Sequence, residues 1–164
     1  MRERIWYELT QSKHNNLYCV YLLSYLRRVL NFFNILILGF STGGIMGWAI
    51  WKEFPLASCI IIAIISLLRL LQPHLIPSDK QIDKLDQVAD FYFDYYNKLE
   101  QLWLDFFNSR ITDVEAQAKF YKIKNSEKSI NKTVTEIIKR TNKKVLTKTD
   151  FETRAYLKNN FKTQ

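Results

Sequence analysis

The sequence predicts an all-α membrane protein: a two-helix transmembrane hairpin preceded by an N-terminal helix and followed by a long cytoplasmic aromatic helix and C-terminal helices. Three observations predict this class. Two uncharged apolar runs follow one another closely, all four glycines lie in the first run, and a 3.5-residue apolar repeat begins soon after the second run. The rest of the chain is polar, and the formal net charge is +8.

The first run, Val29–Trp51, is 23 residues long and contains no charged side chain. At about 1.5 Å per residue, a helix of this length reaches roughly 35 Å, enough to cross a hydrocarbon core of about 30 Å. Gly39, Gly43 and Gly47 recur at every fourth position. Small residues at this spacing let two helices in lipid approach closely, so we predict that these glycines form a helix-packing face.

The second run, Phe54–Leu68, holds 15 uncharged residues. Arg69 can extend its stem along the span and place its guanidinium among the headgroups, so we expect the helix to continue to about Leu71. Pro73 and Pro77 are expected to end it. The predicted hairpin covers residues 29–72, with spans at about 29–51 and 54–71.

Charge predicts the orientation of the hairpin. The segment before the first span carries five basic and two acidic residues, the segment after the second span is net basic, and the turn carries one residue of each sign. Both termini are therefore expected in the cytoplasm, and the protein in the inner (plasma) membrane. The first run begins late and is long for a signal peptide, so we expect none. The alternative, two buried core helices of a soluble domain, leaves too little amphipathic chain to cover them.

The N-terminal segment, residues 1–28, is predicted to be cytoplasmic and helical. We expect a short amphipathic piece around Ile5, Trp6 and Leu9, followed by one helix that begins near Asn16 and continues through the first span. The tyrosines of this segment suit either the headgroup level or packing against other helices, and packing is the more ordinary role.

Residues 78–108 are predicted to form the long cytoplasmic helix. Ser78 and Gln81 make a capping box at its start. Apolar residues then alternate at spacings of three and four, which is the repeat of a coiled-coil seam. Because other faces of this helix are also apolar, we expect two neighbours, the N-terminal helix and the same helix of a second subunit. The residues of this predicted oligomer seam are Ile82, Leu85, Ala89, Tyr92, Tyr96, Leu99, Trp103 and Phe106.

No catalytic constellation is visible in the sequence. Asp83, Asp86, Asp90 and Asp94 repeat at helical spacing near lysines, which favours a solvated helix face over paired catalytic acids. The two histidines are far apart, and the chain has no paired-cysteine motif, no phosphate-binding glycine loop and no nucleophile elbow. We therefore expect a protein that is not an enzyme and that uses no cofactor and no metal.

The C-terminal region, residues 109–164, is basic, with 13 basic and four acidic residues from Lys119 onward. We expect short helices at 133–140 and 151–161 with a Lys-rich loop between them. One interpretation is that this region folds over the acidic helix. The other is that it binds an anionic partner such as acidic lipid headgroups, a nucleotide or a short nucleic acid, with Phe120 and Tyr121 as stacking faces. The candidate residues for such a ligand are Lys122, Lys124, Lys128, Lys139, Arg140, Lys143 and Lys144.

The first span also has a stripe of mixed polarity, roughly opposite the glycines. Polar side chains within a span usually face another helix or water, so this stripe suits the wall of a water-filled pore. The alternative is that the asparagines lie near the inner interface and that the serine bonds its own backbone. A hairpin monomer cannot enclose a pore, so a pore requires an oligomer. The pore-lining candidates are Asn31, Asn34, Leu38, Ser41, Ile45 and Trp48.

This architecture resembles the SLATT-like two-transmembrane effectors of bacterial antiphage defence over roughly Ile5–Phe107. The resemblance lies in the Arg27-Arg28 flank, the Gly39-to-Gly47 helix, the Pro55 turn and the long aromatic helix. It implies an oligomeric channel, for example a tetramer, that depolarises the membrane when a nucleotide signal linked to a nucleotidyltransferase changes. In the related Hailong-type channel effectors a DNA oligomer holds the channel shut, and the basic tail would suit such an oligonucleotide.

The sequence thus predicts an oligomeric membrane effector that forms a regulated ion channel or pore in antiphage defence. Two alternatives stay open. One is a non-conducting membrane anchor or scaffold whose cytoplasmic helices recruit a partner, and the other is an unregulated, holin-like toxin. Substitutions on the polar stripe separate a channel from an anchor, and deletion of the basic tail separates a regulated channel from a toxin.

Overall fold

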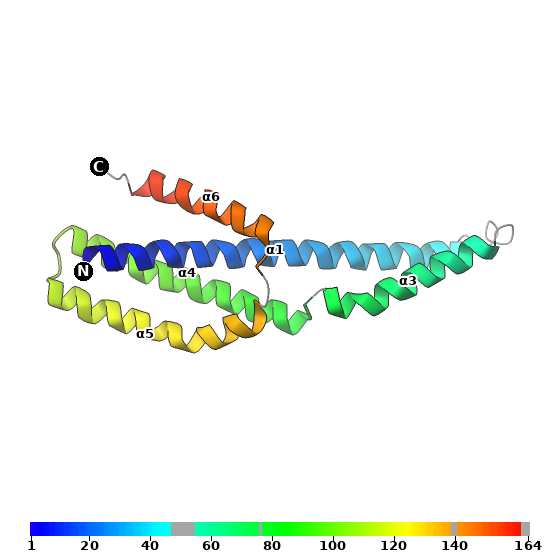
Figure 1. The fold of residues 1–164 in the computed structure, drawn as a ribbon, viewed down its shortest axis with the longest axis horizontal. Coiled ribbons are helices and arrows are strands. Elements are labelled where there is room, and N and C mark those ends of the chain that lie inside the picture. The colour runs from blue at the N-terminus through cyan, green and yellow to red at the C-terminus, as the bar shows by residue number, and fades with distance from the viewer. Residues whose placement is uncertain (47–54, 76, 139–140, 162–164) are drawn as a thin grey trace. The chain divides into compact units, whose positions relative to one another are not determined.

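The computed structural model describes residues 1–46, 55–75, 77–138 and 141–161. The side chains of residues 40–46, 55, 57–58, 61 and 73–75 lie outside this description. The described residues are helical and include no strand, which confirms the all-α class (Figure 1). They form α1 (Arg2–Met46), α3 (Pro55–Leu75), α4 (Asp79–Phe107), α5 (Asp113–Ile137) and α6 (Lys143–Asn160).

The chain divides into two compact units. The first, which we name the four-helix unit, consists of residues 1–23 and 81–164. The second, the hairpin unit, consists of residues 24–80. Because α1 crosses the boundary at residue 23, its first part belongs to the four-helix unit and its second part to the hairpin unit.

The break expected near Asn16 is absent, because α1 runs without interruption from Arg2. No proline or glycine occurs in this part of the chain, and residues with good helix propensity, such as leucine, are frequent in it. Its buried side also repeats every 3.5 residues, which provides a continuous packing face from the first turn onward. This face consists of Ile5, Leu9, Ser12, Asn16, Cys19 and Leu23, all of which are buried.

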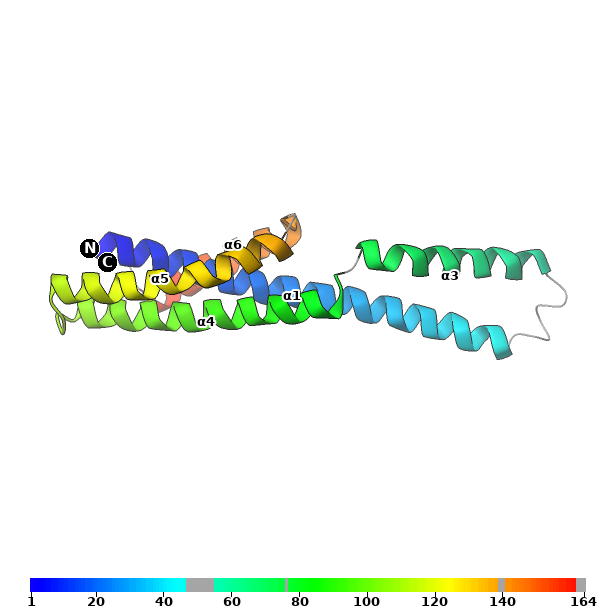
Figure 2. The same cartoon turned by 90° about the horizontal axis from the view of Figure 1, so that it is seen from below.

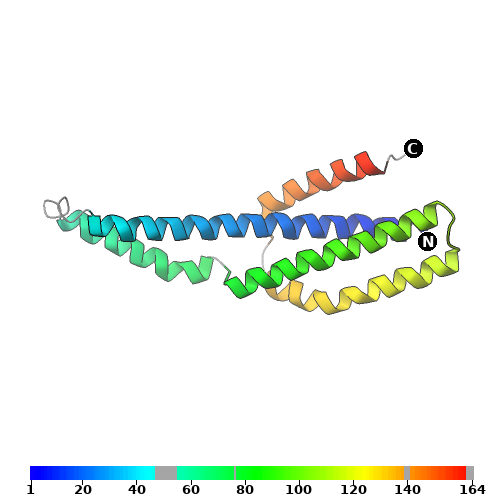
Figure 3. The same ribbon diagram turned by 180° about the vertical axis from the view of Figure 1, so that it is seen from behind.

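In the four-helix unit, α1 and α4 form a central antiparallel pair, with α5 on one side and α6 on the other (Figures 1 and 3). Asn16 is buried between the central helices and donates its amide hydrogen to the Ala89 carbonyl at 3.0 Å. A buried asparagine in a helical seam favours the register in which its hydrogen bond is made. The 3.5-residue faces of α1 and α4 therefore pack as one seam within a single chain.

The prediction that the seam of α4 joins two subunits is wrong for most of its residues. Six of the eight are buried within the single chain: Ile82, Leu85, Ala89, Tyr92, Tyr96 and Leu99. Of the other two, Trp103 packs on Trp6 of α1 with a distance of 5.0 Å between the ring centroids, and Phe106 is partly buried. The physical reason is that α1, α5 and α6 already pack against this seam of α4, so a second copy is not needed to fill it.

The C-terminal region is more helical than the sequence suggested. α5 begins at a capping box in which the Thr112 hydroxyl accepts from the Glu115 amide, and the Glu115 carboxylate accepts from the Thr112 amide. The expected helix at 133–140 is only the end of α5. The Lys-rich segment expected as a loop forms the first half of α6, because Asn142 caps it and Val145 and Thr149 face the bundle.

In the hairpin unit, the second part of α1 and α3 run antiparallel (Figure 2). α3 begins at Pro55, where a missing amide hydrogen costs nothing because the first helical amides have no intrahelical acceptor. The helix continues past Pro73 to Leu75, so Pro73 does not end it as predicted. A proline two residues from the end removes one backbone bond and leaves little helix beyond it to distort.

Candidate functional site

The hairpin unit exposes large apolar side chains along both of its helices. On α1 these include Phe32, Ile35 and Leu38, with exposed fractions of 62%, 70% and 65%. On α3 they are Leu56, Ile60, Ile62, Ile64, Leu67, Leu70 and Leu71. Contiguous apolar surface of this kind is unusual on a water-soluble monomer and marks a contact with lipid or protein.

By length and composition, α1 is the one helix among the described residues that could cross a membrane. Only 6% of its apolar window is buried in the structure, whereas a core helix of a soluble protein is mostly buried. In α3 the described apolar stretch is Ile62–Gln72, which is shorter than a span.

The pore-lining candidates are only partly within the described residues. Asn31, Asn34 and Leu38 are exposed on α1 and are not packed in the interior of the chain. Ser41 and Ile45 lie in α1 with undescribed side chains, and Trp48 lies outside the described residues.

The glycine face of α1 is also open at Gly39. A Cβ atom added at Gly39 would meet no atom within 4 Å, so this position does not hold the two helices of the hairpin in close contact. Gly43 lies in α1 and Gly47 lies outside the described residues. Close packing of the glycine face against a helix of another molecule stays a prediction.

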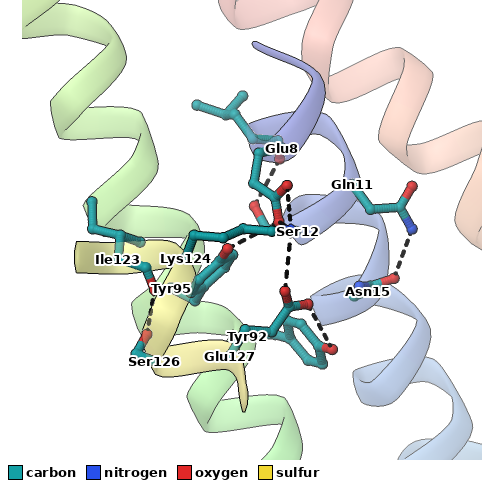
Figure 4. A network of polar contacts seen from close by, with 11 residues as sticks. Glu8, Gln11, Ser12, Asn15, Tyr92, Tyr95, Ile123, Lys124, Ser126 and Glu127 are labelled. Atoms are coloured by element: carbon teal, nitrogen blue, oxygen red, sulfur yellow. Dashed lines mark hydrogen bonds and ion pairs between the residues drawn. The ribbon is translucent and has the colours of Figure 1, made fainter. Parts of the chain in front are cut away.

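A polar network joins three helices inside the four-helix unit (Figure 4). Glu8 of α1 has a side chain only 10% exposed, and both of its carboxylate oxygens lie 2.7 Å from Lys124 Nζ of α5. The Tyr95 hydroxyl of α4 donates to Glu8 Oε1 at 2.9 Å. Lys124 also contacts Glu127 at 3.3 Å, and the Tyr92 hydroxyl lies 3.5 Å from the other oxygen of Glu127.

Burial and the carboxylates fix the protonation states of this network. Burial, the hydrogen bond to Glu8 and the charges of Glu8 and Glu127 raise the pKa of Tyr95, and burial and the Glu127 charge raise the pKa of Tyr92. Burial alone would lower the pKa of Lys124, but its contacts with Glu8 and Glu127 outweigh this effect and raise it. At neutral pH the tyrosines are therefore hydrogen-bond donors and the lysine is a cation, which suits a brace between helices.

An open groove with a volume of about 730 Å³ lies beside this network, between α1 and α5. Its walls carry charges of both signs and several aromatic rings. Arg4 donates to the Tyr121 hydroxyl at 3.1 Å, so part of the cationic surface is already engaged. Among the described residues no group of histidine, cysteine and carboxylate side chains is arranged to hold a metal ion. The lining residues are Glu3, Arg4, Trp6, Tyr7, Glu8, Thr10, Phe120, Tyr121 and Lys124.

The structure does not gather the predicted anion-binding residues into one site. Lys124 is engaged in the internal network, and Phe120 is buried, so it cannot offer a stacking face. Lys139 and Arg140 lie outside the described residues. The four candidates that are exposed are divided between two helices: Lys122 and Lys128 on α5, and Lys143 and Lys144 on α6.

The contact of α6 with the central pair agrees with the interpretation that the basic region folds over the acidic helix, but it is polar and aromatic. His14 Nε2 lies 2.9 Å from Asp150 Oδ1, and Lys13 Nζ lies 3.9 Å from the Tyr156 ring centroid. Two buried polar atoms of this contact, His14 Nδ1 and Thr153 Oγ1, have no hydrogen-bond partner in the described part of the chain. His14 and Asp150 are 136 residues apart in sequence, so no local pattern pairs them.

In comparisons with protein-family models, curated proteins and solved structures, the chain matches none. The functional argument therefore depends on two features of the structure, the exposed apolar hairpin and the braced four-helix unit. The likeness to SLATT-like effectors stays an interpretation of architecture.

Proposed function

We propose that the protein is an oligomeric membrane effector whose hairpin crosses the bilayer twice and lines a regulated ion pathway. The observation that carries the proposal is the surface of the hairpin unit, where exposed asparagines interrupt an exposed apolar face of α1. Lipid would cover the apolar side chains, and an aqueous path between copies would satisfy the asparagines.

The length of α3 supports a second span. Its 21 residues extend for about 31 Å, close to the thickness of a hydrocarbon core. Its single charged side chain, Arg69, lies near one end, where snorkelling can place the guanidinium in the headgroups. Arg27 and Arg28 lie just before the first span. By the positive-inside rule they support a hairpin in the inner membrane with both termini on its cytoplasmic side.

The physiological role follows from the resemblance to SLATT-like effectors. We infer that opening the pathway depolarises the membrane during antiphage defence, and that the four-helix unit regulates it. A nucleotide or oligonucleotide is the ligand class that this resemblance suggests.

Planar-bilayer recording of the full-length protein tests conduction. Wild type is expected to give discrete current steps. Replacing Asn34 by aspartate should shift the reversal potential toward cation selectivity in a salt gradient, and replacing it by lysine should shift it toward anions, because a charge at a pore wall attracts its counter-ion.

The matched control replaces Ile35, the exposed neighbour of Asn34, by leucine, which should leave selectivity unchanged. If inserted, oligomeric protein carries no current in the presence or absence of oligonucleotides, a non-conducting anchor is the better account. If a charge at position 34 leaves the reversal potential unchanged, the polar stripe of α1 does not line the pore.

A further inference from the structure

The outer face of α4 is acidic and carries an exposed aromatic ring. Asp83, Asp90 and Asp94 are spaced by seven and four residues, so they lie on one side of the helix. All three are exposed, and Phe93 beside them is 53% exposed. Within the described part of the chain, no ion pair or hydrogen bond engages these three carboxylates.

The outer face of α6 is basic, opposite in charge to the outer face of α4. Lys144, Phe151, Arg154 and Lys158 follow at spacings of seven, three and four residues, so they also share one side of a helix. All four are exposed, and Phe151 is 71% exposed. No acidic side chain lies among them, and in the described residues none of the three cationic groups is paired.

These two faces are complementary in length as well as in charge. Asp83 and Asp94 are separated by 11 residues and Lys144 and Lys158 by 14, which correspond to about 16 Å and 21 Å along a helix. Each face places one phenylalanine among its charges. Within one chain the two faces cannot meet, because α4 and α6 present their other sides to each other through Tyr96 and Tyr156.

We propose that the outer face of α4 in one copy docks on the outer face of α6 in a second copy. The contact is heterologous, and its repetition closes into a ring when the rotation between neighbouring copies divides a full turn. The proposal rests on the oligomer assumed in the proposed function, and it names the surface that assembles it once the seam of α4 is filled within the chain. Opposite charges would set the register, and burial of Phe93 and Phe151 would supply most of the affinity.

An anionic lipid surface is a different possible occupant of the α6 face. It explains the basic side chains and Phe151, but it would repel the acidic face of α4 and leave Phe93 uncovered. A second copy accounts for both faces, which is why the observations favour it.

Charge reversal in the full-length protein tests the docking. Light scattering in detergent micelles would measure the mass of the assembly. One variant reverses the α4 face by changing Asp83, Asp90 and Asp94 to lysine. The other reverses the α6 face by changing Lys144, Arg154 and Lys158 to glutamate. Each variant alone should no longer form the oligomer. Mixing these two variants should restore it, since each then offers a face complementary to the other. A chain with both faces reversed should assemble with itself and not with wild type.

The matched control reverses three exposed lysines of α5, Lys122, Lys128 and Lys132, and should assemble as wild type does. Helical content by circular dichroism separates misfolding from lost docking. A second test in the Cys59→Ser background mixes Asp90→Cys and Arg154→Cys chains and looks for a disulfide-linked dimer of the two. Lys128→Cys in place of Arg154→Cys should give none.

Each outcome decides a different question. If both reversals leave the oligomer intact, the docking surface is wrong, whatever the protein conducts. If the α6 reversal lowers binding to vesicles containing phosphatidylglycerol while assembly is unchanged, lipid is the occupant and the proposal fails. Loss of current with an intact oligomer would count against the pore and not against the docking.

Discussion

Glu8 is the residue at which three helices of the four-helix unit meet. Its buried carboxylate accepts from Tyr95 of α4 and contacts Lys124 of α5 through both oxygens. Removal of one member of a buried ion pair leaves the other uncompensated, and the cost comes mainly from that remaining charge. Because the Lys124 side chain is 42% exposed, solvent screens part of the interaction, and the effect is smaller than for a fully buried pair.

Substitution of Lys124 by methionine should destabilise the four-helix unit by about 1–3 kcal/mol, because Glu8 keeps its charge and loses its cation. Adding Glu8→Gln in the same chain should recover part of this loss. Urea unfolding followed by circular dichroism, arranged as a double-mutant cycle, measures the coupling. Strictly additive effects would show that the two side chains do not stabilise one another.

The same pair predicts a dependence on alkaline pH. The folded pKa of Lys124 is raised above its unfolded value of about 10.4, so the protonated lysine stabilises the folded state. This stabilisation is complete below the unfolded pKa and is lost as pH rises through the folded pKa. The difference in free energy of unfolding between wild type and Lys124→Met should be constant from about pH 7 to pH 9 and shrink above about pH 10.5. A constant difference up to pH 11.5 would contradict the assigned role.

At the scale of the elements, the apolar repeat of α4 is strong and predicted its bounds closely. The apolar repeats of the C-terminal helices are weak, and their predicted bounds were wrong. The 3.5-residue repeat and Ser78 predicted a helix at 78–108, and α4 spans Asp79–Phe107. α5 and α6 bury few apolar residues, and α6 turns Thr149 and Thr153 toward the bundle, so hydrophobic periodicity could not reveal them. Their caps at Thr112 and Asn142 were the available local signal.

α6 should be the most easily opened helix of the four-helix unit. Its contact contains unpartnered buried polar atoms, and its first turn depends on Asn142, whose Oδ1 accepts from the amides of Lys144 and Val145 at 3.1 and 3.3 Å. Asn142→Ala should cost about 1 kcal/mol, and hydrogen exchange should quicken in α6 while α4 is unchanged. Asn142→Asp keeps the cap and serves as control. Equal acceleration in α4 would mean that the two helices open together.

At the scale of the whole molecule, sequence reasoning identified the fold class and the apolar hairpin but not the internal network. Span length and glycine content are local properties that can be read along the chain. Glu8 and Lys124 are separated by 116 residues, and only the packing of α1 against α5 brings them together. The same packing determines which part of α4 is covered, so the predicted oligomer seam could not be distinguished from an internal one.

The division into two units predicts that the membrane affinity of the chain resides in the hairpin unit. The chain leaves the four-helix unit at Leu23 and returns at Gln81. These positions are seven and eight residues beyond the contact of Asn16 with Ala89, so in an antiparallel pair they lie at nearly the same level. Neighbouring helix axes are about 10 Å apart, and a flexible linker of about eight Gly and Ser residues reaches roughly 15 Å.

Replacement of residues 24–80 by such a linker should therefore yield a folded, helical protein that fractionates with the soluble proteins of the cell, whereas the full chain should remain in membranes after alkaline carbonate washing. Cell fractionation and thermal unfolding followed by circular dichroism measure both properties. A linker variant that stays in the membrane would assign membrane binding to the four-helix unit. If the full chain is instead soluble without detergent, the exposed apolar side chains of α1 and α3 must be covered by protein, and both the pore and the two spans would have to be abandoned.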